Sequence, residues 1–490
     1  MSKVLLINPR IPSLSSKGFL MPTGLLWLGS FLDQNGHEVK IINAHGNSNY
    51  LKEIKNELGS SEFVGISAMT VQVQNGLEIS DYIKSIDSSI PIVWGGVHAN
   101  LFPEKTLEDK AVDFVIKNEG EYPILALANY YEKKGELKNV NGIVFKNKYG
   151  KIIETPEQRT FDMDELERVK WELLPKKMVQ NIKSGYFGAN IHTSRGCPHR
   201  CTFCINTVTK MRYRVRSVEN VLKDLEDAHD FGIEEFKFRD ENFFVDVKRV
   251  EKIMDGILNG GLDFVWNASI RVDYVSRGNV TVDILEKIKK SGCKYLNFGA
   301  ESGSQRVLNI LKKDITPEDT IKSAKIMNKI GGIIPYYSFI LGIPTETNED
   351  RIATIKLIDR LLKECPSMRV VGPHIFRPYP GGELYELCLK NGWEEPDSLR
   401  AWSSKAMEDG VFASAKNLPW VDDPERVESI SYSAYWTNGL KRMMSKKTAF
   451  LRLLAVLSYT SSKMRWKLKF FDLPIDIKIM KFLRRYKSNL

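Results

Sequence analysis

The chain has 490 residues, of which 42% are hydrophobic and 27% are charged, and these proportions are ordinary for a soluble globular protein of two or three domains. Six cysteines, three of them clustered, and a start that does not resemble a targeting segment favour a reducing cytoplasm. The net charge of +10 belongs to a basic tail, because residues 441–490 hold fourteen Lys or Arg against two Asp.

Short apolar segments alternate with amphipathic ones at the start of the chain. The pattern predicts strands at 4–8, 38–43, 63–68, 92–95 and 114–117 and helices at 25–35, 73–86 and 122–133. Such alternation is typical of a doubly wound parallel sheet, which binds ligands at the carboxyl ends of its strands. Polar or glycine-rich loops follow these strands at 8–24, 67–72, 95–100 and 118–121. A hairpin over 142–154 comes next.

Three cysteines lie close together in the middle of the chain. Cys197, Cys201 and Cys204 are separated by three and two residues, and no fourth cysteine follows nearby to complete a tetrahedral zinc site. The spacing suits a cubane iron–sulfur cluster that is held by three thiolates and has one open iron. An incomplete zinc knuckle with a remote His and a coincidental buried set are the alternatives. The other three cysteines are scattered singly and are interpreted as core or surface thiols.

A second alternation of strands and helices surrounds these cysteines. Strands are predicted at 189–194, 235–239, 264–270, 295–299, 334–341 and 369–376, with helices at 217–231, 247–259, 282–291, 317–330 and 348–364. Six such units suit a partial (β/α)6 barrel, whose catalytic groups lie at the carboxyl ends of its strands. The cysteine loop follows the first strand, and polar or glycine-containing segments follow the others, which predicts a polar ring around one mouth of the barrel.

The cysteine spacing and this ordered ring resemble the radical S-adenosylmethionine (radical SAM) superfamily. In that family the open iron chelates S-adenosylmethionine, which is cleaved to a 5′-deoxyadenosyl radical. The resemblance implies that Cys197, Cys201 and Cys204 are the catalytic cluster ligands. It also implies S-adenosylmethionine contacts at Phe203, Asp240, Glu241, Ser269, Arg271, Glu301, Gly342 and Ile343. Two structural alternatives stay open, a helix cap for Asp240 and a buried ion pair for Glu301, and His192 is interpreted as a core histidine.

Four segments of the first region, at 24–28, 36–39, 95–98 and 119–121, look like the cobalamin-binding domain that precedes many radical SAM enzymes. The resemblance implies cobalamin contacts at Thr23, Gly24, Ser67, Met69, Thr70, Gly95, Gly96, His98, Glu119 and Gly120. The Asp-x-His-x-x-Gly motif of other cobalamin proteins is absent, because the nearest stretch, 43–48, does not fit it. No cobalt ligand is therefore named, and His98 is interpreted as a loop histidine that lines a polar pocket.

These patterns divide the chain into four parts. We expect a Rossmann-like cobalamin-binding domain at 1–160, a connector at 161–184, a radical SAM partial barrel at 185–386 and a helical region with a basic tail at 387–490. In the last part, the apolar run at 448–459 is too short to span a bilayer. The runs at 463–471 and 479–486 mix bulky apolar residues with Lys and Arg, which suits either peripheral contact with an anionic membrane or a helical cap with a solvated basic face. No groove-reading motif favours nucleic acid.

The resemblance implies a cytoplasmic cobalamin-dependent radical SAM enzyme, in first place a C-methyltransferase that acts on an unactivated carbon. One alternative is a radical SAM cyclase, oxidase or rearrangement enzyme without methyl transfer, and another is a non-catalytic iron–sulfur redox protein. The implied cofactors are a 4Fe-4S cluster, S-adenosylmethionine and cobalamin. The implied partners are a small-molecule or lipid-like substrate and an external reductant of the flavodoxin or ferredoxin kind.

Overall fold

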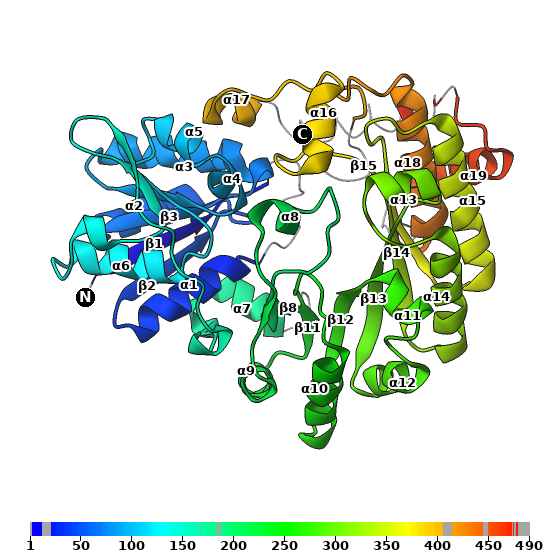
Figure 1. Cartoon of the computed structure of the whole chain (residues 1–490), viewed down its shortest axis with the longest axis horizontal. Coiled ribbons are helices and arrows are strands. Elements are labelled where there is room, and N and C mark those ends of the chain that lie inside the picture. The colour runs from blue at the N-terminus through cyan, green and yellow to red at the C-terminus, as the bar shows by residue number, and fades with distance from the viewer. Residues whose placement is uncertain are drawn as a thin grey trace.

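Two sheets lie side by side in the computed structural model, which describes residues 2–11, 21–166, 168–183, 188–404, 414–443, 449–472, 474 and 477–478 (Figure 1). The first sheet has the strand order β2-β1-β3-β4-β5-β6-β7, in which β1 to β5 are parallel and the β6–β7 hairpin is antiparallel. Its strands are β1 (Lys3–Asn8), β2 (Glu38–Asn43), β3 (Phe63–Ser67), β4 (Ile92–Gly95), β5 (Phe114–Ile116), β6 (Ile143–Lys146) and β7 (Ile152–Glu154). This order is that of a doubly wound fold.

Helices cover both faces of this sheet. They are α1 (Thr23–Gln34), α2 (Tyr50–Leu58), α3 (Val73–Ile86), α4 (Val97–Leu101), α5 (Pro103–Glu108) and α6 (Glu121–Tyr131), with 3-10 turns η1 (Thr70–Gln72) and η2 (Leu137–Asn139). Val4 and Leu6 of β1 belong to one buried cluster, whereas Leu5 and Ile7 belong to another. Because successive strand residues point to opposite faces, a strand buried on both sides reads as one continuous apolar run.

A connector of short elements leads to the second sheet. It contains η3 (Met163–Glu165), η4 (Trp171–Leu173) and α7 (Lys176–Lys183). The first sheet ends at Glu154 and the second begins at Ala189. The domain boundaries at 160, 184 and 386 stay predictions.

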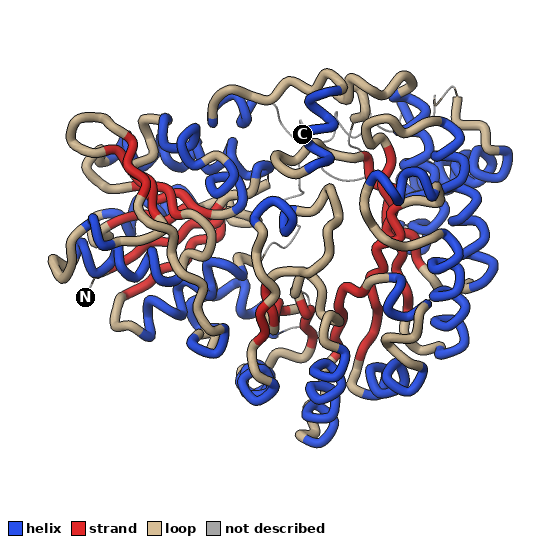
Figure 2. Tube along the Cα trace, viewed as in Figure 1, coloured by secondary structure: helices blue, strands red, loops and turns tan. Residues whose placement is uncertain are grey.

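The second sheet is a parallel, open barrel of six strands in the order β15-β14-β13-β12-β11-β8. Its strands are β8 (Ala189–Ile191), β11 (Glu235–Phe238), β12 (Val265–Ile270), β13 (Cys293–Glu301), β14 (Ile334–Leu341) and β15 (Arg369–Ile375). The long helices of the barrel are α9 (Val218–Asp230), α10 (Val247–Asn259), α12 (Val282–Lys290), α14 (Pro317–Ile330) and α15 (Asn348–Glu364). Shorter elements are β9 (Ser194–Arg195), β10 (Arg214–Val215), α8 (Ile205–Thr209), α11 (Val272–Ser276), α13 (Gln305–Ile310) and α16 (Glu383–Lys390). Figure 2 shows the strands of this sheet in a curved row with helices outside it.

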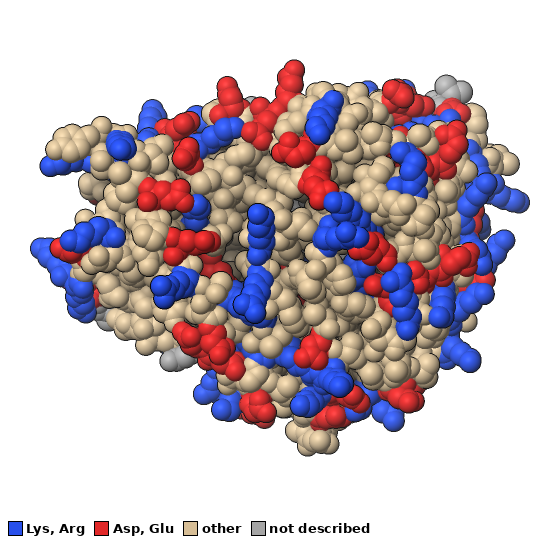
Figure 3. Space-filling model, viewed as in Figure 1, with Lys and Arg blue, Asp and Glu red and all other residues tan. Residues whose placement is uncertain are grey.

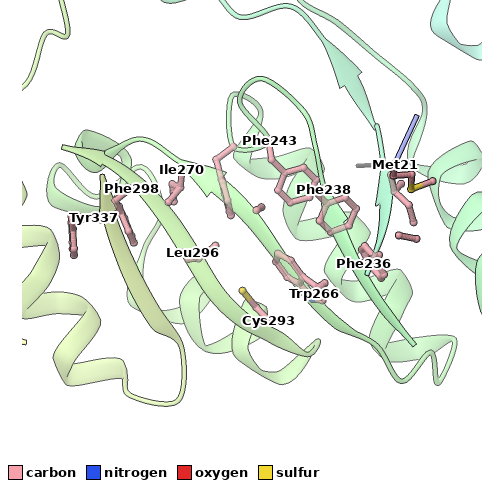
Figure 4. Packing of buried hydrophobic residues seen from close by; sticks show 14 of the residues in the cluster. Met21, Phe236, Phe238, Phe243, Trp266, Ile270, Cys293, Leu296, Phe298 and Tyr337 are labelled. Carbon is pink, nitrogen blue, oxygen red and sulfur yellow. The ribbon is translucent and has the colours of Figure 1, made fainter. Parts of the chain in front are cut away.

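Aromatic residues fill the layer between barrel strands and helices (Figure 4). Phe238 stacks on Phe243 with ring centroids 4.1 Å apart, and Trp266 lies edge-on to Phe238 at 5.2 Å. The intervening strand residues, which face the inside of the barrel by strand alternation, include the polar Lys237, Asn267, Asn297 and Ser338 as well as the apolar Ile334 and Ile340. The interior is therefore suited to a polar or charged ligand.

The predicted strand 189–194 is divided into β8 and β9. The break falls where the Thr193 N–H donates to Asp240 Oδ1 at 2.7 Å instead of continuing the ladder. The other predicted strands and helices of both regions differ from the observed elements mainly at their ends.

The C-terminal region contacts both sheets. Helix α17 (Leu399–Ser404) packs on α3 of the first domain, where Trp402 is buried and Arg400 pairs with Asp81 and Asp109. Helix α18 (Pro424–Met443) packs on β15 and on α19 (Ala449–Leu468). Among the described residues, no helix is both long and apolar enough to cross a bilayer. The predicted run 479–486 lies outside the described residues.

Candidate active site between the two sheets

The cysteine loop is held tightly at both ends. It begins at Gly196, whose φ is 81° and where an added Cβ would lie 2.6 Å from the Arg212 carbonyl oxygen, so only glycine fits without displacement. The Thr202 backbone N–H donates to the Leu311 carbonyl at 3.0 Å, and its hydroxyl donates to the Ile310 carbonyl at 3.0 Å. The loop is therefore fixed to the segment after α13.

The three thiols of the loop lie within electrostatic reach of one another. Burial raises the pKa of Cys197 and of Cys204, and the charges of the neighbouring thiols raise both further. A cavity of about 620 Å³ adjoins Cys197. Among the described residues, no three His, Cys, Asp or Glu side chains are arranged to hold a single metal ion. Three thiols from one loop, without a fourth cysteine beside them, are the donor set of a cluster with an open iron.

Two buried cations lie beside these thiols. Arg271 Nη1 is 3.8 Å from Cys201 Sγ, and its Nη2 donates to the Lys313 carbonyl at 2.6 Å. Lys313 Nζ pairs with Glu301 Oε1 at 2.9 Å and lies 5.8 Å from the Phe203 ring centroid. Burial opposes the charge of Lys313, but the Glu301 carboxylate and Cys201 outweigh it and raise its pKa. Positive charge at this place favours the thiolate form that binds iron.

The sequence allowed Glu301 either a contact with S-adenosylmethionine or a buried ion pair, and the structure shows the ion pair, with Lys313. The φ of Glu301 is 61°, and the β13–β14 register shifts between Gly299 and Glu301, so the chain bends where the side chain turns toward Lys313. Contact with S-adenosylmethionine stays a prediction for this residue. Lys313 was missed by the sequence reasoning, because it lies in a loop after a short helix and not at a strand end.

The two predicted acidic contacts, Asp240 and Glu241, have different surroundings. The Asp240 carboxylate accepts from the Thr193 hydroxyl at 2.5 Å and the Ser194 hydroxyl at 2.7 Å, so it supports the strand before the cysteines and caps no helix. Glu241 accepts from the Gly196 N–H at 3.1 Å and lines the cavity between the domains. Of the two, Glu241 has the geometry that a ligand contact needs, and that contact stays a prediction.

The other predicted S-adenosylmethionine contacts lie at the ends of β12 and β14. Ser269 is exposed, whereas Ile343 is buried. The Gly342 N–H donates to Glu346 at 2.6 Å, and its carbonyl accepts from Trp420 Nε1 at 2.9 Å. Both backbone groups of Gly342 are therefore already bonded within the protein, and its contact with S-adenosylmethionine stays a prediction.

A cavity of about 270 Å³ lies between the carboxyl ends of the first sheet and the barrel residues just before the cysteine loop. The predicted cobalamin contacts that line it are Gly24, Ser67, Gly95, Gly96, Glu119 and Gly120. Its walls are the apolar side chains of Leu6, Leu25, Ile66, Val93, Ile116 and Ile124, and the barrel contributes His192, Ser194, Arg195 and Glu241. Thr23 and Met69 line an adjoining cavity.

Two predicted cobalamin contacts, Thr70 and His98, do not line either cavity. His98 is fully buried, with Nδ1 3.3 Å from the Thr70 hydroxyl and its ring 5.6 Å from that of Trp402. Burial lowers the pKa of His98 to about 3, so it is a neutral core histidine and not a pocket-lining one. The helix α17 that covers it comes from a distant part of the chain, which the sequence pattern could not reveal.

The floor of the cavity between the domains fits a flat macrocycle. At Gly96, φ is 86° and an added Cβ would lie 2.8 Å from the Ala68 backbone nitrogen. At Gly24 an added Cβ would meet nothing within 4 Å, so this backbone is open to a ligand. Beside the aliphatic walls, Gly24 leaves room for a large planar group such as the corrin of cobalamin, whereas a glycine at 96 is required by the close approach of the Ala68 backbone.

A buried ion-pair network joins this cavity to the cysteine loop. Arg195 donates to Glu119 at 2.7 Å and to Glu121 at 2.5 Å, and Arg214 donates to Glu119 at 2.6 Å. Burial opposes the ionisation of Glu119, but the two guanidinium groups outweigh it and lower its pKa. Arg195 directly precedes Gly196, so the first domain positions the start of the cluster loop. Neither arginine was predicted, because the network exists only across the domain interface.

Two family descriptions match the chain. The radical SAM superfamily matches residues 191–358 and the B12 binding domain matches residues 9–128. An uncharacterized methyltransferase of Pyrococcus horikoshii is 32% identical over 378 residues, which are 76% of this chain and 79% of the relative. The chain belongs to the radical SAM superfamily.

Other relatives of this radical SAM protein differ in reaction. The anaerobic magnesium-protoporphyrin IX monomethyl ester cyclase of Rubrivivax gelatinosus is 24% identical over 78% of this chain and 69% of its own. The structure of the radical SAM methyltransferase TsrM from Kitasatospora setae superposes with a TM-score of 0.71 over 99% of this chain and all of that one, at 18% identity, which shows a shared fold. The predicted fold class is thereby confirmed.

Family membership also identifies the chain as an enzyme. The cofactors of the two matched families are the 4Fe-4S cluster with S-adenosylmethionine and cobalamin, as predicted. This result excludes the non-catalytic redox protein. The individual contact residues stay predictions.

Proposed function

We propose that this radical SAM enzyme is a cobalamin-dependent C-methyltransferase that acts on an unactivated carbon of a small molecule. The observation that carries the proposal is the cavity between the glycine-rich strand ends of the first sheet and Ser194 and Arg195, which directly precede the cysteine loop. A carbon atom held there would face both cofactors. The 32% identity to an uncharacterized methyltransferase supports methyl transfer.

The chain's own residues would prepare this site in three ways. Cys197, Cys201 and Cys204 would hold the cluster, and Arg271 and Lys313 would favour their thiolate forms. The apolar walls of the cavity would exclude water from the reacting carbon. When bound, the cofactors supply the radical, from S-adenosylmethionine, and the methyl group, through cobalamin.

The experiment is product analysis after anaerobic reconstitution with cluster, cobalamin, S-adenosylmethionine and a reductant. A methyltransferase is expected to form S-adenosylhomocysteine together with 5′-deoxyadenosine, and Cys201→Ala is expected to form no 5′-deoxyadenosine. The control is Cys293→Ala, since Cys293 lies in the barrel core away from the loop.

Radical chemistry without methyl transfer is the second candidate, because one relative is a cyclase. An enzyme of that kind would form 5′-deoxyadenosine alone. Absence of S-adenosylhomocysteine under all substrates would therefore reject the methyltransferase and support this candidate. A reduced flavodoxin or ferredoxin is the proposed electron donor, and it is tested by replacing the chemical reductant in the same assay.

We also propose peripheral membrane contact through α19, which would favour a lipid-like substrate. Leu457, Met464 and Leu468 are exposed and recur on one side of this helix, with Lys463 and Lys467 nearby. By contrast, Trp466 and Phe471 are buried, so two of the five bulky apolar residues in the predicted run at 463–471 face the protein instead.

Sedimentation with phosphatidylserine-containing vesicles tests this contact. The triple variant Leu457→Gln, Met464→Gln, Leu468→Gln is expected to bind less than the wild-type enzyme. Equal binding of the two proteins, or no binding of either, would reject the proposal.

A further inference from the structure

A second cavity, of about 440 Å³, opens beside the one between the domains. The two cavities share Gly24, Leu25, Ser67 and His192, so one large ligand, or two in contact, can reach both. The polar lining of the second cavity consists of Asn8, Thr23, Ser67 and Gln72 from the first domain and Asn190, His192, Lys237 and Arg239 from the barrel. No Asp or Glu is among its described lining residues.

Lys237 and Arg239 carry the charge of this cavity. They are two residues apart around the end of β11, so their side chains leave the strand on the same side. Within the described part of the chain, neither side chain makes an ion pair or a hydrogen bond to a protein group. Glu235 on the same strand acts on Lys237 only from a distance, and it does not line the cavity.

Three other buried or half-buried cations of this protein have a carboxylate partner, whereas the buried Arg249 donates to the Arg216 and Thr193 carbonyls. Arg195 has Glu119, Lys313 has Glu301 and Arg351 has Glu346. Lys237 lacks one, and burial together with the charge of Arg239 lowers its pKa. Lys237 is half-buried and Arg239 is exposed, so the loss of water falls on the Lys237 ammonium, and a ligand of opposite sign would compensate it.

His192 lies at the border of the two cavities. Its ring donates a hydrogen bond to the Arg239 backbone carbonyl, and burial with the charges of Arg195 and Arg239 lowers its pKa to about 4. The ring is therefore neutral at pH 7 and fixes the backbone from which Arg239 projects. It is a positioning residue here and not a core histidine in the sense first expected, since it lines both cavities.

We infer that Lys237 and Arg239 form an oxyanion site that binds a carboxylate or a phosphate. A guanidinium offers paired donors to two oxygens, and an ammonium adds a point charge from a second direction. Neutral donors around them, such as Asn190 and Gln72, would contact the remaining oxygens or the ligand body.

The occupant of this site rests on the proposed function. If substrate lies between corrin and cluster, the oxyanion belongs to a carboxylated or phosphorylated substrate whose other end reaches the reacting centre. The other source of the same chemistry is the phosphodiester in the nucleotide tail of cobalamin. The two sources can be separated by experiment.

The test uses inorganic phosphate and calorimetry on the cluster-loaded enzyme without cobalamin. The wild-type enzyme is expected to bind phosphate at millimolar concentration, and Lys237→Met and Arg239→Met are each expected to weaken binding by about tenfold or more. The matched control is Lys294→Met, because Lys294 is an exposed strand lysine that lines neither cavity. Far-UV circular dichroism verifies that each variant is folded.

The source of the anion is decided by repeating the titration after loading with cobalamin or with cobinamide, which lacks the nucleotide. Phosphate binding that survives cobalamin assigns the site to substrate. Loss of phosphate binding with cobalamin, but not with cobinamide, assigns it to the tail. No phosphate binding by the wild-type enzyme, or equal binding by wild-type and both cavity variants, would overturn the inference. Because no turnover is measured, these results are independent of whether methyl transfer is found.

Discussion

Lys313 and Glu301 form a buried pair next to the cluster ligands, with a distance of 2.9 Å between Nζ and Oε1. Side-chain exposures of 9% and 8% mean that neither charge has much water to replace its partner. The pair therefore has two effects. It holds the end of β13 to the loop after α13, and it places an ammonium near Cys201.

Lys313→Met is expected to destabilise the enzyme strongly, because the Glu301 carboxylate would stay buried and unpaired. Breaking a buried pair from one side costs about 3–5 kcal/mol of unfolding free energy. Urea denaturation measures this loss. The adjacent Lys312 is the control, since its pair with Glu383 is exposed and Lys312→Met should cost about 1 kcal/mol or less. Similar losses for the two variants would contradict this account.

His98 provides a pH-dependent test of its core position. Its folded-state pKa of about 3 is below the ordinary value of 6.5, so the unfolded chain takes up a proton first as the pH falls. The contribution of this group is unchanged above pH 6.5 and becomes increasingly unfavourable to folding as the pH falls from 6.5 toward 3.

The wild-type enzyme should therefore lose more unfolding free energy between pH 7 and pH 5 than His98→Gln does, by about 1–2 kcal/mol. Urea midpoints at the two pH values measure the difference. An identical pH dependence in both proteins would show that His98 is accessible to water.

At the scale of elements, the strand ends of the first sheet provide the cavity floor because glycines stand where β4 meets α4 and where the chain enters α1. Gly96 combines a left-handed φ of 86° with a close approach to Ala68. Gly36 has a similar φ of 85° but nothing within 4 Å of an added Cβ. A comparison of alanine substitutions at the two positions therefore distinguishes the effect of backbone strain from the effect of steric conflict.

Gly96→Ala is expected to cost more stability than Gly36→Ala, because strain of about 1–3 kcal/mol applies to both but only the first also displaces neighbouring backbone. It should also weaken cobalamin binding, as measured by absorbance titration, whereas Gly36→Ala should leave it unchanged. Equal cobalamin affinities of the Gly96→Ala and Gly36→Ala variants would show that Gly96 does not contribute to the corrin site.

At the scale of the whole molecule, the two sheets are joined beside the active site by the Arg195 network and far from it by α17 on α3. Lys and Arg are interspersed with Asp and Glu over the face in Figure 3, as expected for a body whose excess positive charge lies in the tail. Specific buried pairs, and not a net attraction between oppositely charged domains, therefore align the domains.

Arg195→Met is expected to loosen the interface, since it leaves Glu119 with Arg214 alone and Glu121 without a cation. Cobalamin should be lost on gel filtration, and urea unfolding should separate into two transitions. Arg168→Met is the control, because the Arg168–Asp227 pair is exposed. Retention of cobalamin and a single transition in Arg195→Met would show that other contacts suffice.

Local pattern alone determined much of this protein. The period of the apolar residues located the strands and helices of both sheets, since burial on two faces or on one leaves a characteristic repeat. The spacing of Cys197, Cys201 and Cys204 indicated the cluster, because one short loop must supply all three ligands. Glycines after strands likewise indicated the cavity floor, because the need for glycine in a tight turn after a strand is set by neighbouring residues in the chain.

Only the tertiary structure decided which polar groups are free to meet a ligand. Asp240 and Gly342 satisfy the strand-end rule, yet their hydrogen bonds are taken by Thr193, Ser194, Glu346 and Trp420. His98 is covered by α17, and Lys313, Arg195 and Lys237 acquire their roles from partners, or from the lack of them, on distant segments. Hydrogen bonding and charge pairing depend on distances across the fold, which the order of residues along the chain does not contain.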